Sequence, residues 1–301
     1  MRKENRIRRL IFLLLVLLLF VVVIFPAVCS GRRENEENIP VIENSSDDIT
    51  ITQSPDINET YPYREVIDED YWYRILIEAK IPDDIIQNVI TSILESSGFE
   101  RELEVILQQD RYTYILVDKE YALPIDYRPN DLRLIEVGTS SFAAINVSLR
   151  EMAMEALHKM AEAAALEGIT FTIGSSFRSG YYQEEVYNRW VRLLEQEEAD
   201  RVSARPGHSQ HQLGLVVDFA PIDNSFANTP AGRWLADNAS CFGWSLSYPD
   251  GYEHITGYSW ESWHYRYVGK ELAEFIDKYF DGIQQYALQF IHAWLADHSR
   301  Q

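Results

Sequence analysis

The stretch RPGHSQHQLGLVVDF, residues 205–219, places a carboxylate inside an otherwise apolar segment. Pro206 and Gly207 predict a turn, and the apolar run after them predicts a buried strand over 215–220. Asp218 lies within that strand, where a plain buried strand would carry another valine. Because burying an unpaired carboxylate is costly, we expect Asp218 to have a partner close by in the fold.

Two histidines are candidate partners of Asp218. His211 precedes it in the pattern HxxGxxxD, and His264 lies in ESWHYRYVG, residues 261–269. Two histidines and one aspartate are ligand types of catalytic zinc, where three protein groups leave a fourth position for water. Zinc held this way brings the pKa of a bound water to about 7. A salt bridge between Asp218 and a buried arginine is the alternative, and the spacing alone does not decide between them.

Glu261 is a candidate general base. It lies three residues before His264, and residues 262–267 read as a strand that puts His264 and Arg266 on one face. Three residues along a strand would point Glu261 to the other face. We therefore expect Glu261 in the loop just before the strand, where it can face a metal-bound water.

The rest of the chain predicts an α+β fold. Helical patterns and short β-branched strands, such as 169–173, mix without regular βαβ alternation. Ser148 and Glu151 have the spacing of a capping box at the start of a helix. A helix is also expected over 183–197, and two amphipathic helices over 269–280 and 283–295. The expected buried face of the 183–197 helix comprises Val186, Trp190, Val191 and Leu194.

The N-terminus predicts attachment to a membrane. MRKENRIRRL carries five basic residues and one acid, and the 19 residues from Leu10 to Val28 are uncharged. As a helix they would reach about 28 Å, close to the thickness of a bilayer core. The basic tip predicts a cytoplasmic start with the rest of the chain outside. A signal cleaved after Ser30 is the alternative, although the apolar core of such signals is usually shorter.

Composition and patterning predict four segments. Residues 1–30 form the basic tip and the anchor or signal, and residues 31–62 read as an acidic linker. Residues 63–110 predict a helical subdomain, and residues 111–301 form the domain that carries the candidate site, with its C-terminal helices. The net charge of −20 disfavours nucleic acid as a partner, because phosphate binding needs basic patches.

Three motifs together resemble the VanY-type D-alanyl-D-alanine carboxypeptidase family. The family pattern SxHxxGxxxD is met over residues 209–218, ExWHxRYVG over 261–269, and GSSFRSGYYQ, residues 174–183, resembles a third family segment. LVDKEYALPIDYRPNDL, residues 116–132, and WLADNASCFGWSLSYP, residues 234–249, are also similar to it. These zinc peptidases share a fold with lysostaphin-type enzymes and the hedgehog domain. The resemblance therefore implies a small, mainly antiparallel sheet flanked by helices.

The resemblance also implies roles for particular residues. His211, Asp218 and His264 would bind Zn²⁺, Glu261 would activate the water and later protonate the leaving amine, and Arg178 would stabilise the oxyanion. Ser209 and Gln183 are candidates for the substrate's terminal carboxylate, and Tyr248 and Trp263 for the pocket wall or the core. The chain departs from the family at Gly180, where an aromatic residue is common and where Tyr181 or Tyr182 is expected to fill the space. Gln210 and Val216 also depart, which puts substrate preference in doubt.

The implied function is an extracytoplasmic, membrane-anchored zinc carboxypeptidase that removes the C-terminal D-alanine from peptidoglycan stem peptides. An LD-carboxypeptidase acting on an L-lysyl-D-alanine end and a peptidoglycan endopeptidase are alternatives within the same fold. A non-catalytic zinc-stabilised binding module is an alternative of another class. Glu261 and Arg178 disfavour that module, because a structural zinc site needs neither of them.

Overall fold

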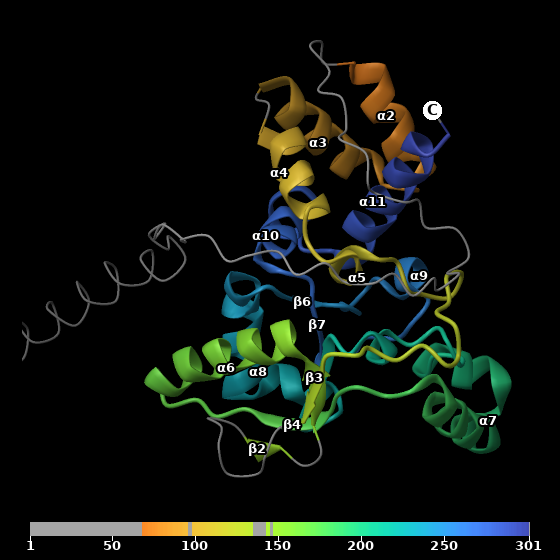
Figure 1. Ribbon diagram of the computed structural model, residues 1–301, viewed down its shortest axis with the longest axis vertical. Helices are drawn as coiled ribbons and strands as arrows, with labels where there is room; N and C mark the ends of the chain where they lie inside the picture. The colour runs from red at the N-terminus through yellow and green to blue at the C-terminus, as the bar shows by residue number, and fades with distance from the viewer. Residues whose placement is uncertain (1–67, 96–97, 135–142, 145–146, 301) are drawn as a thin grey trace, which may run out of the picture. The chain divides into compact units, whose positions relative to one another are not determined.

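Residues 68–95, 98–134, 143–144 and 147–300 are described in the computed structural model of the chain (Figure 1). The anchor or signal expected over 1–30 and the linker expected over 31–62 lie outside these residues. None of the helices within the described ranges has the length and apolar character that crossing a bilayer requires.

A five-stranded sheet carries the residues of interest, in the order β2-β4-β5-β7-β6. Its strands are β2 (Ala143–Ala144), β4 (Thr172–Ser175), β5 (Val216–Phe219), β7 (His264–Tyr267) and β6 (Trp244–Leu246). Only the pair β2–β4 is parallel, and the other neighbours are antiparallel. Separately, β1 (Leu132–Leu134) pairs with β3 (Ser148–Arg150). The expected α+β class with a small, mainly antiparallel sheet is confirmed.

The alternation of side chains along β5 explains how a carboxylate is accommodated there. Successive residues of a strand point to opposite faces. Val217 and Phe219 belong to the hydrophobic core on one face of the sheet, together with residues of α6 (Glu151–Leu166) and α8 (Pro230–Asn238). Asp218 therefore points to the other face of the sheet, away from that core.

Helix α7 (Gly180–Val202) covers more residues than the 183–197 predicted, and it is interrupted. Glu195 has φ 66° and ψ 170°, a backbone conformation outside the helical region that breaks α7 into two segments. Its expected buried face is wrong, because Trp190 and Leu194 are 38% and 37% exposed. The shorter elements near it are α9 (Glu253–Thr256) and the 3₁₀ helices Gln210–Leu213, Asn224–Asn228 and Ala239–Phe242.

One local prediction near the sheet is wrong, and a predicted strand has shifted bounds. Ser148 does not cap a helix, because it belongs to β3 and its N–H donates to the Ser176 hydroxyl. Helix α6 begins at Glu151 with Arg150 at its N-cap and no side-chain capping bond. The strand expected over 169–173 is instead Thr172–Ser175, because the Ile169 N–H bonds the Ala164 carbonyl to close the end of α6.

A second hydrophobic core joins the two ends of the described chain. Helices α2 (Glu69–Glu78), α3 (Asp83–Glu95) and α4 (Gly98–Leu107) pack with α10 (Lys270–Tyr279) and α11 (Gln284–His298), at the top of Figure 1. A short helix, α5 (Arg111–Tyr114), leads from α4 toward the sheet. The helical character expected within 63–110 is present over these helices, and their shared core ties them to the C-terminal helices.

Phe99 is the centre of this second core, and its truncation should be costly. The side chain is fully buried, with ring centroids 4.9 Å from Tyr279, 5.0 Å from Phe275 and 5.5 Å from Trp72. Because a large cavity forms when a buried aromatic ring is deleted, Phe99→Ala should lower the free energy of unfolding by about 3–5 kcal/mol. Urea denaturation measures this change.

The matched control is Val105→Ala on the same helix, because that side chain is 47% exposed. Its expected change is within about 0.5 kcal/mol. Equal losses in the two variants would contradict the central position of Phe99.

Candidate active site

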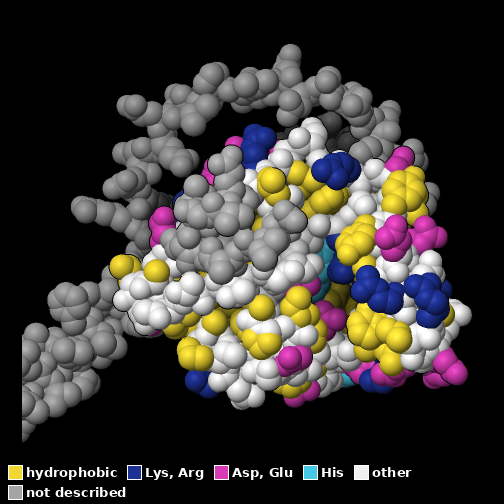
Figure 2. All heavy atoms as spheres, turned by 90° about the horizontal axis from the view of Figure 1, so that it is seen from below, with side chains coloured by type: hydrophobic (Ala, Val, Ile, Leu, Met, Phe, Trp, Pro, Cys, Tyr) yellow, Lys and Arg dark blue, Asp and Glu magenta, His cyan; other side chains and the backbone are white. Residues whose placement is uncertain are grey.

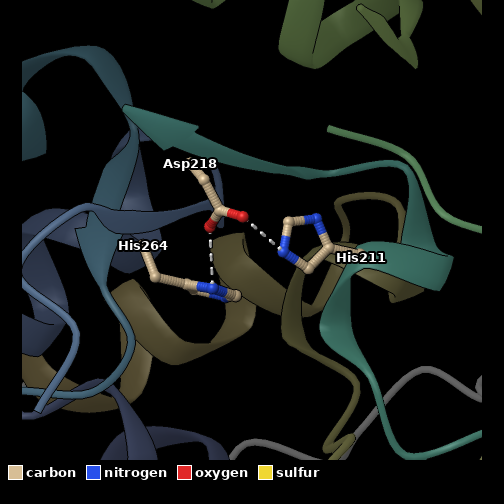
Figure 3. Close-up of side chains that lie close together, drawn as sticks. All are labelled: His211, Asp218 and His264. Carbon is tan, nitrogen blue, oxygen red and sulfur yellow. Dashed lines mark ion pairs between the residues drawn. The ribbon is translucent and has the colours of Figure 1, made fainter. Parts of the chain in front are cut away.

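Two neighbouring strands of the sheet and the 3₁₀ helix before one of them bring His211, Asp218 and His264 together (Figure 3). Asp218 on β5 lies directly opposite His264 on β7 in the antiparallel register. His211 lies in the 3₁₀ helix Gln210–Leu213, just before the chain enters β5. All three side chains are buried, with at most 6% of any of the residues exposed.

The distances in this cluster fit a tetrahedral metal ion. His211 Nε2 lies 3.1 Å from Asp218 Oδ2, and His264 Nδ1 lies 3.1 Å from Asp218 Oδ1. One ligand atom from each residue lies within 4.8 Å of the others. Zinc bonds of about 2.0–2.1 Å in tetrahedral geometry place neighbouring ligand atoms about 3.3 Å apart. Two imidazoles and a carboxylate are also the donor types that zinc prefers, so the three residues could hold this ion.

A backbone contact sets the ring nitrogen that His211 offers. Its Nδ1 lies 2.6 Å from the carbonyl oxygen of Ser176, which can only accept a hydrogen bond. Nδ1 must therefore carry the proton, which leaves the lone pair of Nε2 directed at Asp218. Burial lowers the pKa of His211 to about 4, which keeps this ring neutral and able to bind a metal.

The electrostatics of the other two residues also suit a cation. Burial alone would raise the pKa of Asp218, but the imidazoles of His211 and His264 that face it hold it well below its ordinary value. Burial alone would lower the pKa of His264, but hydrogen bonds with Asp218 and Glu261 raise it to about 9. The site therefore favours a positive charge between these two carboxylates, which a divalent metal would supply on displacing the proton.

Glu261 lies in the segment just before β7, as the spacing predicts. Its Oε2 lies 3.3 Å from His264 Nδ1, and its N–H donates to the Tyr248 carbonyl at 3.0 Å. The side chain is 15% exposed, and burial raises the pKa of its carboxyl group. A carboxylate beside the three candidate ligands and open to the cleft could exchange protons with a metal-bound water.

All nine residues singled out from the sequence line one open cleft of about 1210 Å³. Figure 2 shows this face of the molecule, with histidine visible inside the hollow. The sequence-predicted residues of the lining are Arg178, Gln183, Ser209, His211, Asp218, Tyr248, Glu261, Trp263 and His264. The site was thus found from four separate stretches of sequence that the fold brings to one place.

Arg178 and Gln183 line the cleft, and each has a buried polar atom without a hydrogen-bond partner among the described residues. Arg178 follows β4, and its Nε is buried without a hydrogen-bond partner among the described residues. Gln183 Nε2 donates to the Ala204 carbonyl at 2.6 Å, while its Oε1 has no partner in the described part of the chain. An unpaired acceptor suits a substrate N–H better than the terminal carboxylate that we expected Gln183 to hold.

The other candidates differ in how far they face the cleft. Ser209 accepts a weak hydrogen bond from the His211 N–H at 3.3 Å. The Tyr248 ring lies 4.7 Å from that of His264, so it forms the wall beside a candidate metal ligand. Trp263 packs against the sheet core as well as lining the cleft, so both roles expected for it apply.

One wall of the cleft was not predicted from the sequence. Val186 and Trp190 form a wall contributed by α7, although their helical spacing had predicted core positions.

Gly180 is required by packing, because a Cβ there would collide with the Ile125 carbonyl oxygen. Tyr181 and Tyr182 do not fill the family's aromatic position, because they are 58% and 52% exposed.

Comparison with known proteins agrees with this geometry. Residues 146–270 match the family model described as VanY, D-alanyl-D-alanine carboxypeptidase. The chain is 35% identical over 193 residues to the putative carboxypeptidase YodJ of Bacillus subtilis (strain 168), which covers 60% of this chain and 71% of that protein. The chain belongs to the VanY family. The buried cluster of two histidines and one aspartate offers donor types that suit zinc.

Two further similar proteins are named as carboxypeptidases that act on different peptide bonds. The chain is 30% identical over 174 residues to a D-alanyl-D-alanine carboxypeptidase of Enterococcus faecalis (strain ATCC 700802 / V583), covering 55% of this chain and 62% of that protein. It also resembles the solved structure of the LdcB LD-carboxypeptidase, with a TM-score of 0.50 and 36% identity over 56% of this chain and 85% of that one. Helices α2–α4 and α11 lie outside the residues that match the VanY model.

Proposed function

We propose that the protein is a zinc-dependent carboxypeptidase that hydrolyses the last peptide bond of peptidoglycan stem peptides and releases D-alanine. The convergence of His211, Asp218 and His264 with Glu261 at the floor of an open cleft carries this proposal. Zinc held by these residues would lower the pKa of a water and polarise the scissile carbonyl. A structural zinc site would need neither a cleft nor an additional carboxylate.

Side chains of the protein would supply proton transfer, charge stabilisation and substrate orientation. Glu261 accepts a proton from the attacking water and returns it to the leaving amine of D-alanine, so the proton count balances. Arg178 supplies a fixed positive charge for the oxygen that becomes negative as the carbonyl is attacked. Gln183 and Ser209 orient the end of the peptide, the former through its unpaired Oε1.

The D,D-bond is the proposed target, and the L,D-bond is the second candidate. The VanY model and the enterococcal relative carry D-alanyl-D-alanine in their names, whereas the LdcB structure at 36% identity is that of an LD-carboxypeptidase. A pentapeptide ends in D-Ala-D-Ala, and a tetrapeptide ends in the L,D-bond. The two activities are therefore separated by the peptide from which free D-alanine appears.

Mass spectrometry of parallel digests tests this proposal. The protein with Zn²⁺ should release D-alanine from the pentapeptide and leave the tetrapeptide largely intact. Faster release from the tetrapeptide would move the assignment to the L,D-bond, and larger fragments would move it to an endopeptidase. The same digest with Glu261→Gln protein controls for contaminating peptidases.

We further infer that the catalytic domain acts outside the cytoplasmic membrane. The basic tip, the uncharged run within 1–30 and the acidic segment 31–62 support a single-pass anchor with a linker, and the stem-peptide substrate lies on that side. In this arrangement residues 63–110 form a helical subdomain and residues 111–301 the catalytic domain. Protease added to intact cells should degrade the domain. A mature protein that starts after Ser30 would show that residues 1–30 are a cleaved signal and not an anchor.

A further inference from the structure

Lys119 lies in the segment LVDKEYALP, residues 116–124, outside the part of the chain that matches the family model. Its Nζ lies 3.6 Å from the ring centroid of Tyr258 and donates a hydrogen bond to the carbonyl oxygen of Asp200 on α7. Burial lowers the pKa of Lys119 to about 8, which still leaves the side chain mostly protonated at neutral pH. A cation thus sits on an aromatic face, where the contact is attractive.

Lys119 contacts the first of three rings, Tyr258, Tyr248 and His264, that lie in successive contact. The Tyr258 centroid lies 4.9 Å from that of Tyr248, and the Tyr248 centroid lies 4.7 Å from that of His264. Tyr258 is 3% exposed, and its hydroxyl has no hydrogen-bond partner within the described residues. The position of Tyr258 is therefore held by contacts to its ring and not by its hydroxyl.

The backbone beside Tyr258 is shaped to let the lysine lie across it. Gly257 has φ 75°, and a Cβ at that position would lie 2.7 Å from Lys119 Cγ. The glycine permits both the turn after α9 and the close approach of the lysine stem. Lys119 therefore links three segments: its own, the Gly257–Tyr258 turn, and α7 through the Asp200 carbonyl.

We propose that Lys119 is a positioning residue that fixes the Tyr258–Tyr248 pair against His264 and so holds this metal ligand in its working orientation. Lys119 touches neither the metal ligands nor the cleft around them. Its effect on turnover rests on the proposed function, whereas its effect on the His264 ring does not. These two effects can be measured separately.

The test compares Lys119→Met with Lys119→Arg and with Lys278→Met. Arginine keeps a cation over Tyr258. Lys278 provides the matched control, because its Nζ also lies over a tyrosine ring, 4.6 Å from the Tyr279 centroid, but on α10 in the helical core. Lys119→Met should lower kcat for the pentapeptide about tenfold, or about 1.4 kcal/mol, with KM little changed. Lys119→Arg should recover most of kcat, and Lys278→Met should leave it unchanged.

The second readout is the histidine NMR spectrum of the same proteins labelled with ¹⁵N-histidine. Because a ring 4.7 Å away shifts its neighbour's resonances, the His264 signals should move in Lys119→Met and stay in place in Lys278→Met. If the parent protein releases no D-alanine but these signals move, the proposed function fails and the positioning role stands. Unmoved His264 signals in Lys119→Met overturn the positioning role. So would equal kcat losses in Lys119→Met and Lys278→Met.

Discussion

Replacing Glu261 by glutamine should lower kcat about a thousandfold while the protein still binds one zinc ion. Glutamine keeps the shape of the side chain but cannot accept a proton, and general acid–base groups typically contribute about 10²–10⁴-fold. Glu261 lies 3.3 Å from His264 and shares its cleft, yet it is not one of the three residues that cluster as metal ligands. Steady-state kinetics with the pentapeptide and metal analysis of the purified variant measure the two quantities.

Glu198→Gln is the control for this variant. Glu198 is another glutamate with a charged partner, Arg201 at 2.7 Å, but it is 45% exposed and outside the cleft lining. It should retain parental kcat. Retention of more than about a tenth of the activity by Glu261→Gln would exclude the proton-transfer role, and loss of zinc would make Glu261 a metal-binding residue instead.

Replacing Asp218 by asparagine should weaken zinc binding more than about 100-fold and abolish turnover at ordinary zinc concentrations. Changes to groups that only support metal ligands already cost about 10–100-fold in affinity, so loss of a charged ligand should exceed that range. Asparagine also removes the charge that both histidines face at 3.1 Å. Competition with a chromophoric chelator gives the dissociation constant of zinc.

Asp237→Asn provides the comparison for Asp218→Asn, because Asp237 is exposed on α8 and outside the cleft. Chelator-treated parental protein should behave like Asp218→Asn and regain activity when zinc is added back. Activity that survives in the chelator or in Asp218→Asn would contradict a zinc mechanism that uses this cluster.

Residue types and the family resemblance predicted which residues lie together in the candidate site. A carboxylate in an apolar strand demanded a partner, and the histidine motifs supplied donor types that suit zinc. The spacing between Glu261 and His264 placed the glutamate before the strand, and the structure has it there. The position of Glu261 was predicted correctly because it depends only on side-chain alternation over a few residues of a strand.

Local patterns failed where another part of the chain competed for the same atoms. The capping box at Ser148 was lost because β3 pairs with β1, and the Arg150 side chain forms ion pairs with Asp110 and Asp131. The face of α7 that includes Trp190 was predicted to be core because helical spacing does not distinguish a core from a cleft wall.

The sequence by itself predicted the α+β class that the fold shows, and its resemblance to a known family predicted the three candidate metal ligands and Glu261 as the candidate acid–base residue. Only the tertiary structure decided that Asp218 lies opposite His264, that the Ser176 carbonyl selects the free nitrogen of His211, and that α2–α4 share a core with α10 and α11. These features join residues far apart in the chain. Their geometry depends on strand register and side-chain packing over long sequence separations, which local propensity and spacing do not encode.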